Sequence, residues 1–137
     1  MSEGKKILVA YDGSEDANMA VQKAIATAKP NGSVTLVYVY WDPEERKSDL
    51  LMHETENAEQ DAGSRVFTNI EPKLKKSGVQ YDLMVEQHRD IPGGILMIAQ
   101  KGGFDAIAVG MMGTGGKTMG PVYQKLKAQS KIPLITP

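Results

Sequence analysis

The sequence lacks several features, and each absence excludes a class of protein. It contains no cysteine, which excludes disulfide bonds, zinc–thiolate centres and cysteine nucleophiles. It has no apolar run near the roughly 20 residues that a membrane-spanning helix needs. Its net charge of −1 provides no overall basic field for binding nucleic acid or an anionic membrane. The first residues, Met1 to Lys6, contain no apolar signal-peptide core, so we expect a cytoplasmic protein.

The length of 137 residues is typical of one domain, so we expect a single domain over residues 1–137. Five apolar segments are typical of strands: Ile7–Tyr11, Val34–Tyr40, Val79–Val85, Phe104–Val109 and Ile132–Ile135. Segments with apolar residues at helical spacing separate them, at 15–28, 49–76, 91–101 and 122–130. Pro72 lies inside the second helical segment and is expected to kink or break it.

The strict alternation of strands and helices predicts an α/β fold. Because a parallel sheet needs helical crossovers on its faces, we expect three layers in the order α/β/α. We assume the Rossmann-like order 3-2-1-4-5 for the five-stranded parallel sheet. The third strand begins with alternating apolar and polar residues, which suits an edge of the sheet.

The segment Gly110–Gly120 is the most unusual part of the sequence. Five of its eleven residues are glycine, its only charged residue is Lys117, and it follows the fourth predicted strand. Such a turn between a buried strand and a helix lets the backbone approach an anion and direct N–H groups at it. The segment therefore predicts a phosphate-bearing ligand. The alternative is a crossover that binds nothing, in which Lys117 is a solvated lysine.

In an open parallel sheet, ligands bind beyond the carboxyl ends of the strands, where the strand order reverses. In the assumed order, this point lies between the first and fourth strands, so Asp12 and Gly110–Gly120 face one crevice. Glu15 and Asp16 already occupy the positive end of the first helix, so we expect phosphates at the glycine-rich segment instead. Asp12 suits the neutral end of a nucleotide, where it would accept a hydrogen bond from an amino or hydroxyl group. Its alternative role is to close the turn or to cap the helix with Ser14.

The order and spacing of these segments resemble the universal stress protein family along essentially the whole chain. The similar segments are Ile7–Ser14, Asp90–Pro92, Asp105–Gly110 and Ile132–Ile135. Family members that bind ATP carry Gly, two residues and a second Gly, followed after a longer spacer by Gly-Ser or Gly-Thr. Gly110 and Gly113 match the first pair, but the spacer before Gly120 is about three residues short, and Pro121 replaces the hydroxyl residue. AMP or ADP would then fit better than ATP, another anion would bind, or nucleotide binding would be lost.

The residues and the resemblance together imply an adenine nucleotide (ATP, ADP or AMP) as the ligand, with or without Mg²⁺. The nucleotide-binding residues that we predict are Ala10, Tyr11, Asp12, Val39, Gly110, Met111, Gly113, Thr114, Gly115, Gly116, Lys117, Thr118 and Gly120. The resemblance also implies the adenine nucleotide alpha hydrolase-like fold, a homodimer formed through the last strand, Ile132–Ile135, and a stress-response or regulatory role.

The sequence contains no dedicated general base or set of metal ligands, so any ATP hydrolysis would be slow or incidental. His53 and His88 lie far apart and lack metal-ligand spacing. Two other functions remain open. One is a dimeric interaction module of the same fold that binds no nucleotide, which Pro121 favours. The other is an adenylyl-transfer enzyme of the wider adenine-nucleotide α/β group, although its His-x-Gly-His and Ser-Gly-Gly-x-Asp-Ser signatures do not occur in this sequence.

Overall fold

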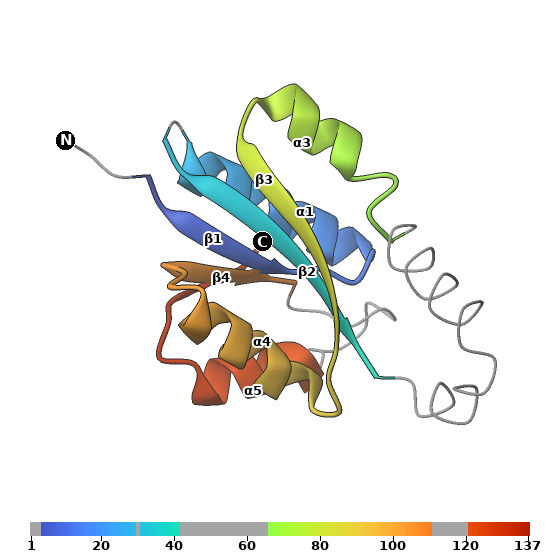
Figure 1. The fold of residues 1–137 in the computed structure, drawn as a ribbon, viewed down its shortest axis with the longest axis vertical. Coiled ribbons are helices and arrows are strands. Elements are labelled where there is room, and N and C mark those ends of the chain that lie inside the picture. The colour runs from blue at the N-terminus through green and yellow to red at the C-terminus, as the bar shows by residue number, and fades with distance from the viewer. Residues whose placement is uncertain (1–3, 30, 42–65, 111–120) are drawn as a thin grey trace.

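The computed structural model describes residues 4–29, 31–41, 66–110 and 121–137 (Figure 1). The strands within these residues are β1 (Lys6–Ala10), β2 (Ser33–Tyr40), β3 (Gln80–Gln87), β4 (Ala106–Val109) and β5 (Leu134–Ile135). The helices are α1 (Glu15–Ala28), α3 (Glu71–Ser77), α4 (Ile91–Lys101) and α5 (Pro121–Gln129). Of the helices described here, none has the length and apolar character needed to cross a membrane.

The five strands form one parallel sheet in the order β3-β2-β1-β4-β5, which confirms the predicted fold class. The central strand β1 pairs with β2 on one side and β4 on the other, so that Ile7 lies opposite both Val34 and Ala106. β3 is at one edge of the sheet, as its sequence pattern predicts, and β5 is at the other edge. The strand order reverses between β1 and β4, which is the usual ligand position in such sheets.

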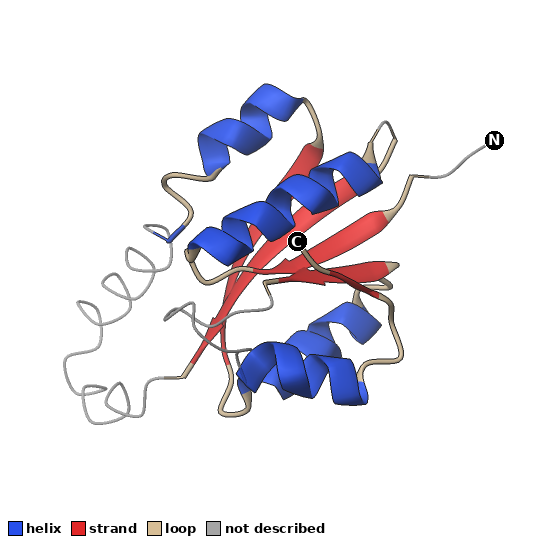
Figure 2. Cartoon of the chain, turned by 180° about the vertical axis from the view of Figure 1, so that it is seen from behind, coloured by secondary structure: helices blue, strands red, loops and turns tan. Residues whose placement is uncertain are grey.

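Helices cover both faces of the sheet. Figure 2 and Figure 1 show α1 and α3 against one face, and α4 and α5 side by side against the other. Each face has its own apolar core, because successive strand residues point to opposite sides. On β1, Ile7 and Val9 belong to the core beneath α1, whereas Leu8 belongs to the core beneath α4 and α5. All three side chains are fully buried, so β1 contributes to both cores.

Helix α1 begins where the sequence predicts it. The Ser14 Oγ atom accepts a hydrogen bond from the Ala17 backbone N–H at 3.1 Å, which satisfies one of the amides left unpaired at a helix start. Glu15 and Asp16 lie in the first turn, where their negative charges face the positive end of the helix dipole. The side chains of Ser14, Glu15 and Asp16 therefore stabilise the start of α1.

The predicted helical segment over residues 49–76 is interrupted near Pro72, as expected, but the interruption lies just before the proline. Residues 67–70 form a turn, and α3 begins only at Glu71, with Pro72 in its first turn. Proline has no backbone N–H and a fixed φ angle, so it is tolerated at the start of a helix but not in its interior. Residues 49–65 of this prediction lie outside the described residues.

The last strand is shorter than the predicted range Ile132–Ile135. β5 starts at Leu134, because the Ile132 N–H donates to the Ser130 hydroxyl at 3.0 Å and Pro133 has no N–H to pair. The Pro133 carbonyl accepts a hydrogen bond from a backbone N–H of β4 at 2.9 Å. This bond aligns β5 beside β4 at the edge of the sheet.

Candidate functional site

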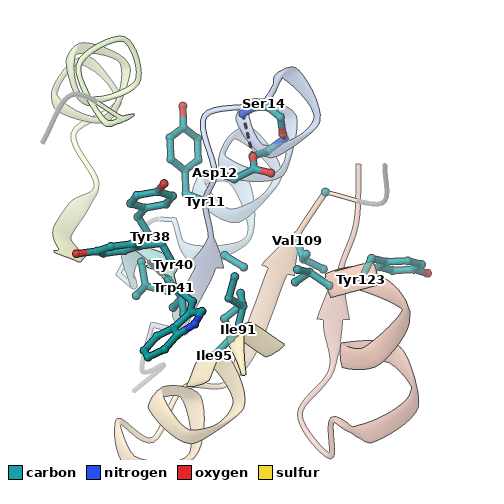
Figure 3. A pocket seen from close by; sticks show the side chains of 16 residues that line it. Tyr11, Asp12, Ser14, Tyr38, Tyr40, Trp41, Ile91, Ile95, Val109 and Tyr123 are labelled. Atoms are coloured by element: carbon teal, nitrogen blue, oxygen red, sulfur yellow. Dashed lines mark hydrogen bonds between the residues drawn. The ribbon is translucent and has the colours of Figure 1, made fainter. Parts of the chain in front are cut away.

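A cavity of about 350 Å³ lies at the carboxyl ends of β1, β2 and β4 (Figure 3). This volume is within the range of small-molecule binding sites. The ends of these three strands and residues of α1, α4 and α5 form its walls, so segments far apart in the sequence meet here. The cavity lies where the sequence predicts a ligand site, because β1 and β4 are neighbours and the strand order reverses between them.

One wall of the cavity is apolar. Val37 and Val39 of β2 and Val109 of β4 are buried on the sheet face that α4 and α5 cover. Val37 and Val39 share this face because alternate residues of a strand point to the same side. Ile91 and Ile95 of α4 complete the wall. Five aliphatic side chains suit the face of an aromatic ring better than they suit a phosphate.

Aromatic side chains from the end of β2 lie on one side of the cavity. The rings of Tyr38 and Tyr40 are stacked, with centroids 5.4 Å apart and 13° between their planes. Trp41 follows β2 directly and also lines the cavity, and Figure 3 shows its indole below the two tyrosine rings. Trp41 is the only tryptophan in the sequence, so the protein's tryptophan fluorescence reports on this cavity.

The turn between β1 and α1 contributes the polar part of the cavity. The Asp12 Oδ1 atom accepts a hydrogen bond from the Ser14 backbone N–H at 2.9 Å. Gly13 has a φ angle of +83°, a left-handed conformation that costs little energy only for glycine. Asp12 therefore closes the turn, which was one of its two predicted roles. The bond occupies one carboxylate oxygen, so this exposed carboxylate can also accept hydrogen bonds from a ligand.

Tyr11 contributes its backbone to the cavity, and Figure 3 shows its ring pointing away from the apolar wall. The Tyr11 N–H donates to the Val37 carbonyl at 2.9 Å, which extends the pairing of β1 with β2 into the site. The ring is buried in the core beneath α1, where its hydroxyl donates to Asn18 Oδ1 and its face stacks on Phe67. Burial, and secondly the negative charge of Asp12, raise the pKa of the Tyr11 phenol above its ordinary value of 10.0.

The described part of the cavity carries negative charge. Asp12 is the only charged side chain among the described residues that line it. Glu15 and Asp16 add negative charge in the first turn of α1. Within the described ranges, no group of three His, Cys, Asp or Glu side chains could hold a metal ion, so these residues offer no ligand set for Mg²⁺. They favour a ligand group with N–H or O–H donors, and a phosphate would need positive charge from elsewhere.

The structure brings part of the predicted site together. The predicted residues that line this cavity are Ala10, Tyr11, Asp12, Val39 and Gly110. The predicted residues that lie outside the described residues are Met111, Gly113, Thr114, Gly115, Gly116, Lys117, Thr118 and Gly120. The role of both groups in binding a ligand stays a prediction.

The sequence alone did not assign Tyr38, Tyr40, Trp41 or the α4 residues to the site. Trp41 continues the two-residue period of Val37 and Val39, so the alternation of β2 contained a signal for it. Ile91 and Ile95 lie in the first turns of α4, close to the carboxyl edge of the sheet. The inner face of a helix at this edge lines a ligand crevice as well as a core, and apolar spacing alone does not distinguish the two.

The sequence pattern of the universal stress protein family matches residues 4–136 of the chain. The chain belongs to the universal stress protein family. The resemblance found in its sequence segments is therefore confirmed. This universal stress protein is similar to the solved structure of hypothetical protein MJ0577, the subject of a structure-based assignment of biochemical function. The two superpose with a TM-score of 0.77 at 25% sequence identity, over 98% of this chain and 95% of that chain.

Two further solved structures share the fold of this universal stress protein. A universal stress protein family protein from Arabidopsis thaliana, with AMP bound, has a TM-score of 0.66 at 16% identity, over 96% of this chain and 90% of that chain. A universal stress protein in complex with cAMP has a TM-score of 0.60 at 18% identity, over 98% of this chain and 97% of that chain. A separate comparison with curated proteins gave no significant match.

Proposed function

We propose that this universal stress protein binds an adenine nucleotide in the cavity at the carboxyl ends of β1, β2 and β4, in a stress-response or regulatory role. The observation that carries the proposal is the division of the cavity into an apolar wall and one carboxylate, at the point where the strand order reverses. Structures of the same fold with AMP and with cAMP support it.

The adenine ring would lie against the apolar wall formed by Val37, Val39, Val109 and Ile95. Burying apolar surface there contributes about 25 cal/mol for each Å² removed from water. Adenine carries an exocyclic amino group and ribose carries hydroxyl groups, and all of these donate hydrogen bonds. The Asp12 carboxylate accepts such bonds, and its charge strengthens them. If Asp12 accepts from the adenine amino group, guanine would place a carbonyl oxygen against the carboxylate at that position, and adenine would then be favoured.

The phosphates would point away from α1 and toward the residues that follow β4. Glu15 and Asp16 occupy the first turn of α1, so a phosphate placed there would meet negative charge. Gly110 follows β4 directly and lies beside this turn, and Lys117, which follows it in the sequence, supplies the positive charge that the described lining residues lack. The short spacer before Gly120 favours AMP or ADP over ATP.

The proposed role is binding rather than turnover. Asp12 is the only charged side chain among the described lining residues, and its Oδ1 atom is already bonded to the Ser14 N–H at 2.9 Å. We therefore expect any ATP hydrolysis to be slow. The second candidate is an interaction module of the same fold that binds no nucleotide, which is favoured by Pro121 in the place of a serine or threonine.

We also propose a homodimer formed through β5. This strand is at an edge of the sheet, so within the described structure its outer side has no neighbouring strand. An open edge can pair with the same edge of a second copy about a two-fold axis.

Titrations that follow Trp41 fluorescence test the proposed binding. We expect a saturable change with AMP and ADP, a weaker response to ATP, and an affinity for GMP roughly tenfold or more below that for AMP. Free N-acetyltryptophanamide, titrated in parallel, corrects for light absorbed by the nucleotide. Mass spectrometry of ligand released from the purified protein detects any nucleotide that is already bound. The proposal fails if no adenine nucleotide gives a saturable change and none is released.

A further inference from the structure

Val66 and Phe67 lie against the turn that carries Asp12. The Phe67 side chain is 3% exposed, and its ring stacks on the Tyr11 ring with centroids 5.8 Å apart and 23° between the planes. A Cβ atom placed on Gly13 would lie 3.1 Å from the Val66 Cγ2 atom, which shows how closely Val66 covers the turn. Two residues far from the turn in sequence are therefore packed directly on it.

β2 and α1 hold the same turn from its other sides. The Tyr11 N–H donates to a carbonyl of β2 at 2.9 Å, and the Tyr11 hydroxyl donates to Asn18 Oδ1 on α1. The Tyr11 ring belongs to the core between the sheet and α1, where Phe67 packs against it. Because Asp12 follows Tyr11 directly, a displacement of the Tyr11 backbone also displaces Asp12.

Neither Val66 nor Phe67 is among the residues that line the cavity, so neither would touch a ligand there. Phe67 belongs to the core on the opposite face of the sheet from the apolar wall. An effect of Phe67 on binding would be indirect. When a site spends less time in its binding conformation, its apparent affinity falls in the same proportion. Without the Phe67 ring, Tyr11 loses its stacking partner and the turn gains other conformations.

We infer that Phe67 is a positioning residue for the ligand site: its ring holds Tyr11, and through Tyr11 the Asp12 carboxylate, in the orientation that a ligand requires. The inference rests on the proposed nucleotide-binding function only for the measurement of affinity. A second measurement, the hydrogen exchange of the Ser14 amide, follows the turn itself, because this amide donates to Asp12 Oδ1 at 2.9 Å.

Two truncations of the same core test the inference. Phe67→Ala removes the ring that stacks on Tyr11, and Leu74→Ala removes a fully buried side chain of α3 that serves as the matched control. For Phe67→Ala we expect the dissociation constant for AMP to rise roughly fivefold or more. We also expect exchange of the Ser14 amide, measured by NMR, to accelerate roughly tenfold. For Leu74→Ala both values should stay within about twofold of the wild-type values.

The variant Phe67→Tyr keeps the ring, so its affinity for AMP and its rate of Ser14 amide exchange should both stay close to the wild-type values. Equal effects of Phe67→Ala and Leu74→Ala would overturn the inference, because the cause would then be a general loss of packing. If the wild-type protein binds no AMP but Phe67→Ala alone accelerates Ser14 exchange, nucleotide binding is rejected and the positioning role is supported. If exchange is also unchanged, both ideas fail. Should the alanine variants not fold, Phe67→Leu and Leu74→Val provide the same comparison with smaller cavities.

Discussion

A Cβ atom on Gly110 would lie 2.9 Å from the Asp16 Cβ atom, at the point where the end of β4 meets the first turn of α1. It would also lie 3.1 Å from the backbone nitrogen of Ala17. Side-chain carbons essentially never approach this closely, so only glycine allows β4 and α1 to pack at this distance. The sequence predicts Gly110 for its freedom to approach a phosphate, and the structure adds a packing requirement at the same position.

Gly110→Ala is expected to destabilise the protein by about 1–3 kcal/mol, because the new methyl group forces the end of β4 and the start of α1 apart. The same displacement should weaken AMP binding, since both segments line the cavity. Urea unfolding measures the first effect, and a fluorescence titration measures the second.

Gly103→Ala is the matched control for this prediction. A methyl group on Gly103 meets no atom within 4 Å, but the φ angle of +66° makes the substitution strained. We expect a cost of about 1–2 kcal/mol with no change in AMP affinity, because Gly103 precedes β4 at the end of the strand remote from the cavity. Wild-type stability of Gly110→Ala would show that the close approach of β4 to α1 is not required.

The pH dependence of stability above neutrality should depend on Tyr11. Its pKa is raised above 10.0, chiefly by burial and then by the charge of Asp12, so the folded state keeps the phenolic proton more tightly than the unfolded state. Its contribution to stability is fully present below pH 10 and is lost as the pH rises through the higher pKa of the folded state. The free energy of unfolding, from urea titrations at several pH values, should therefore fall above pH 10.

Tyr11→Phe removes this phenol and should flatten the alkaline decrease. It should also cost about 0.5–1.5 kcal/mol at neutral pH, because the hydrogen bond to Asn18 Oδ1 is lost. Tyr81→Phe provides a comparison, because it removes the other phenol whose pKa is raised. The causes of that shift are burial, the hydrogen bond to Glu71 and the charge of the Glu71 carboxylate. An unchanged alkaline decrease in Tyr11→Phe would mean that other groups cause it.

Local sequence patterns were enough to predict the strands and helices whose limits are set by neighbouring residues in the sequence. The buried strand beginning at Ile7 and the helix capped by Ser14 follow directly from apolar runs and capping residues. The period of four that extends past Pro72 was misleading, because the same spacing continues through a turn and into α3. The close approach of Gly110 to Asp16 depends on tertiary packing, which no local pattern records. The position of Trp41 on the cavity depends on how far β2 extends.

The proposed dimer should dissociate when charge is added beside β5. In a two-fold pairing of β5 with its own copy, a residue close to the axis lies near the same residue of the partner, so Thr136→Lys, just after β5, would bring like charges together. We expect the dimer dissociation constant, from sedimentation velocity over a concentration series, to rise roughly tenfold or more. Gln80→Lys places the same charge on β3, at the opposite edge of the sheet, where Gln80 is exposed. This variant should leave the dimer dissociation constant unchanged. Dissociation caused by Gln80→Lys instead would place the interface at β3.

Calorimetric titration of AMP into the wild-type protein, Asp12→Asn and Asp82→Asn tests the proposed binding site most directly. The asparagine at position 12 keeps an oxygen that can accept from the Ser14 N–H, so stability should change by less than about 0.5 kcal/mol. The loss of the charged acceptor should weaken AMP binding by about tenfold. Asp82 is exposed on β3, so Asp82→Asn should bind AMP as the wild type does. Absence of AMP binding to the wild type, or equal affinities of all three proteins, would contradict a nucleotide site at Asp12.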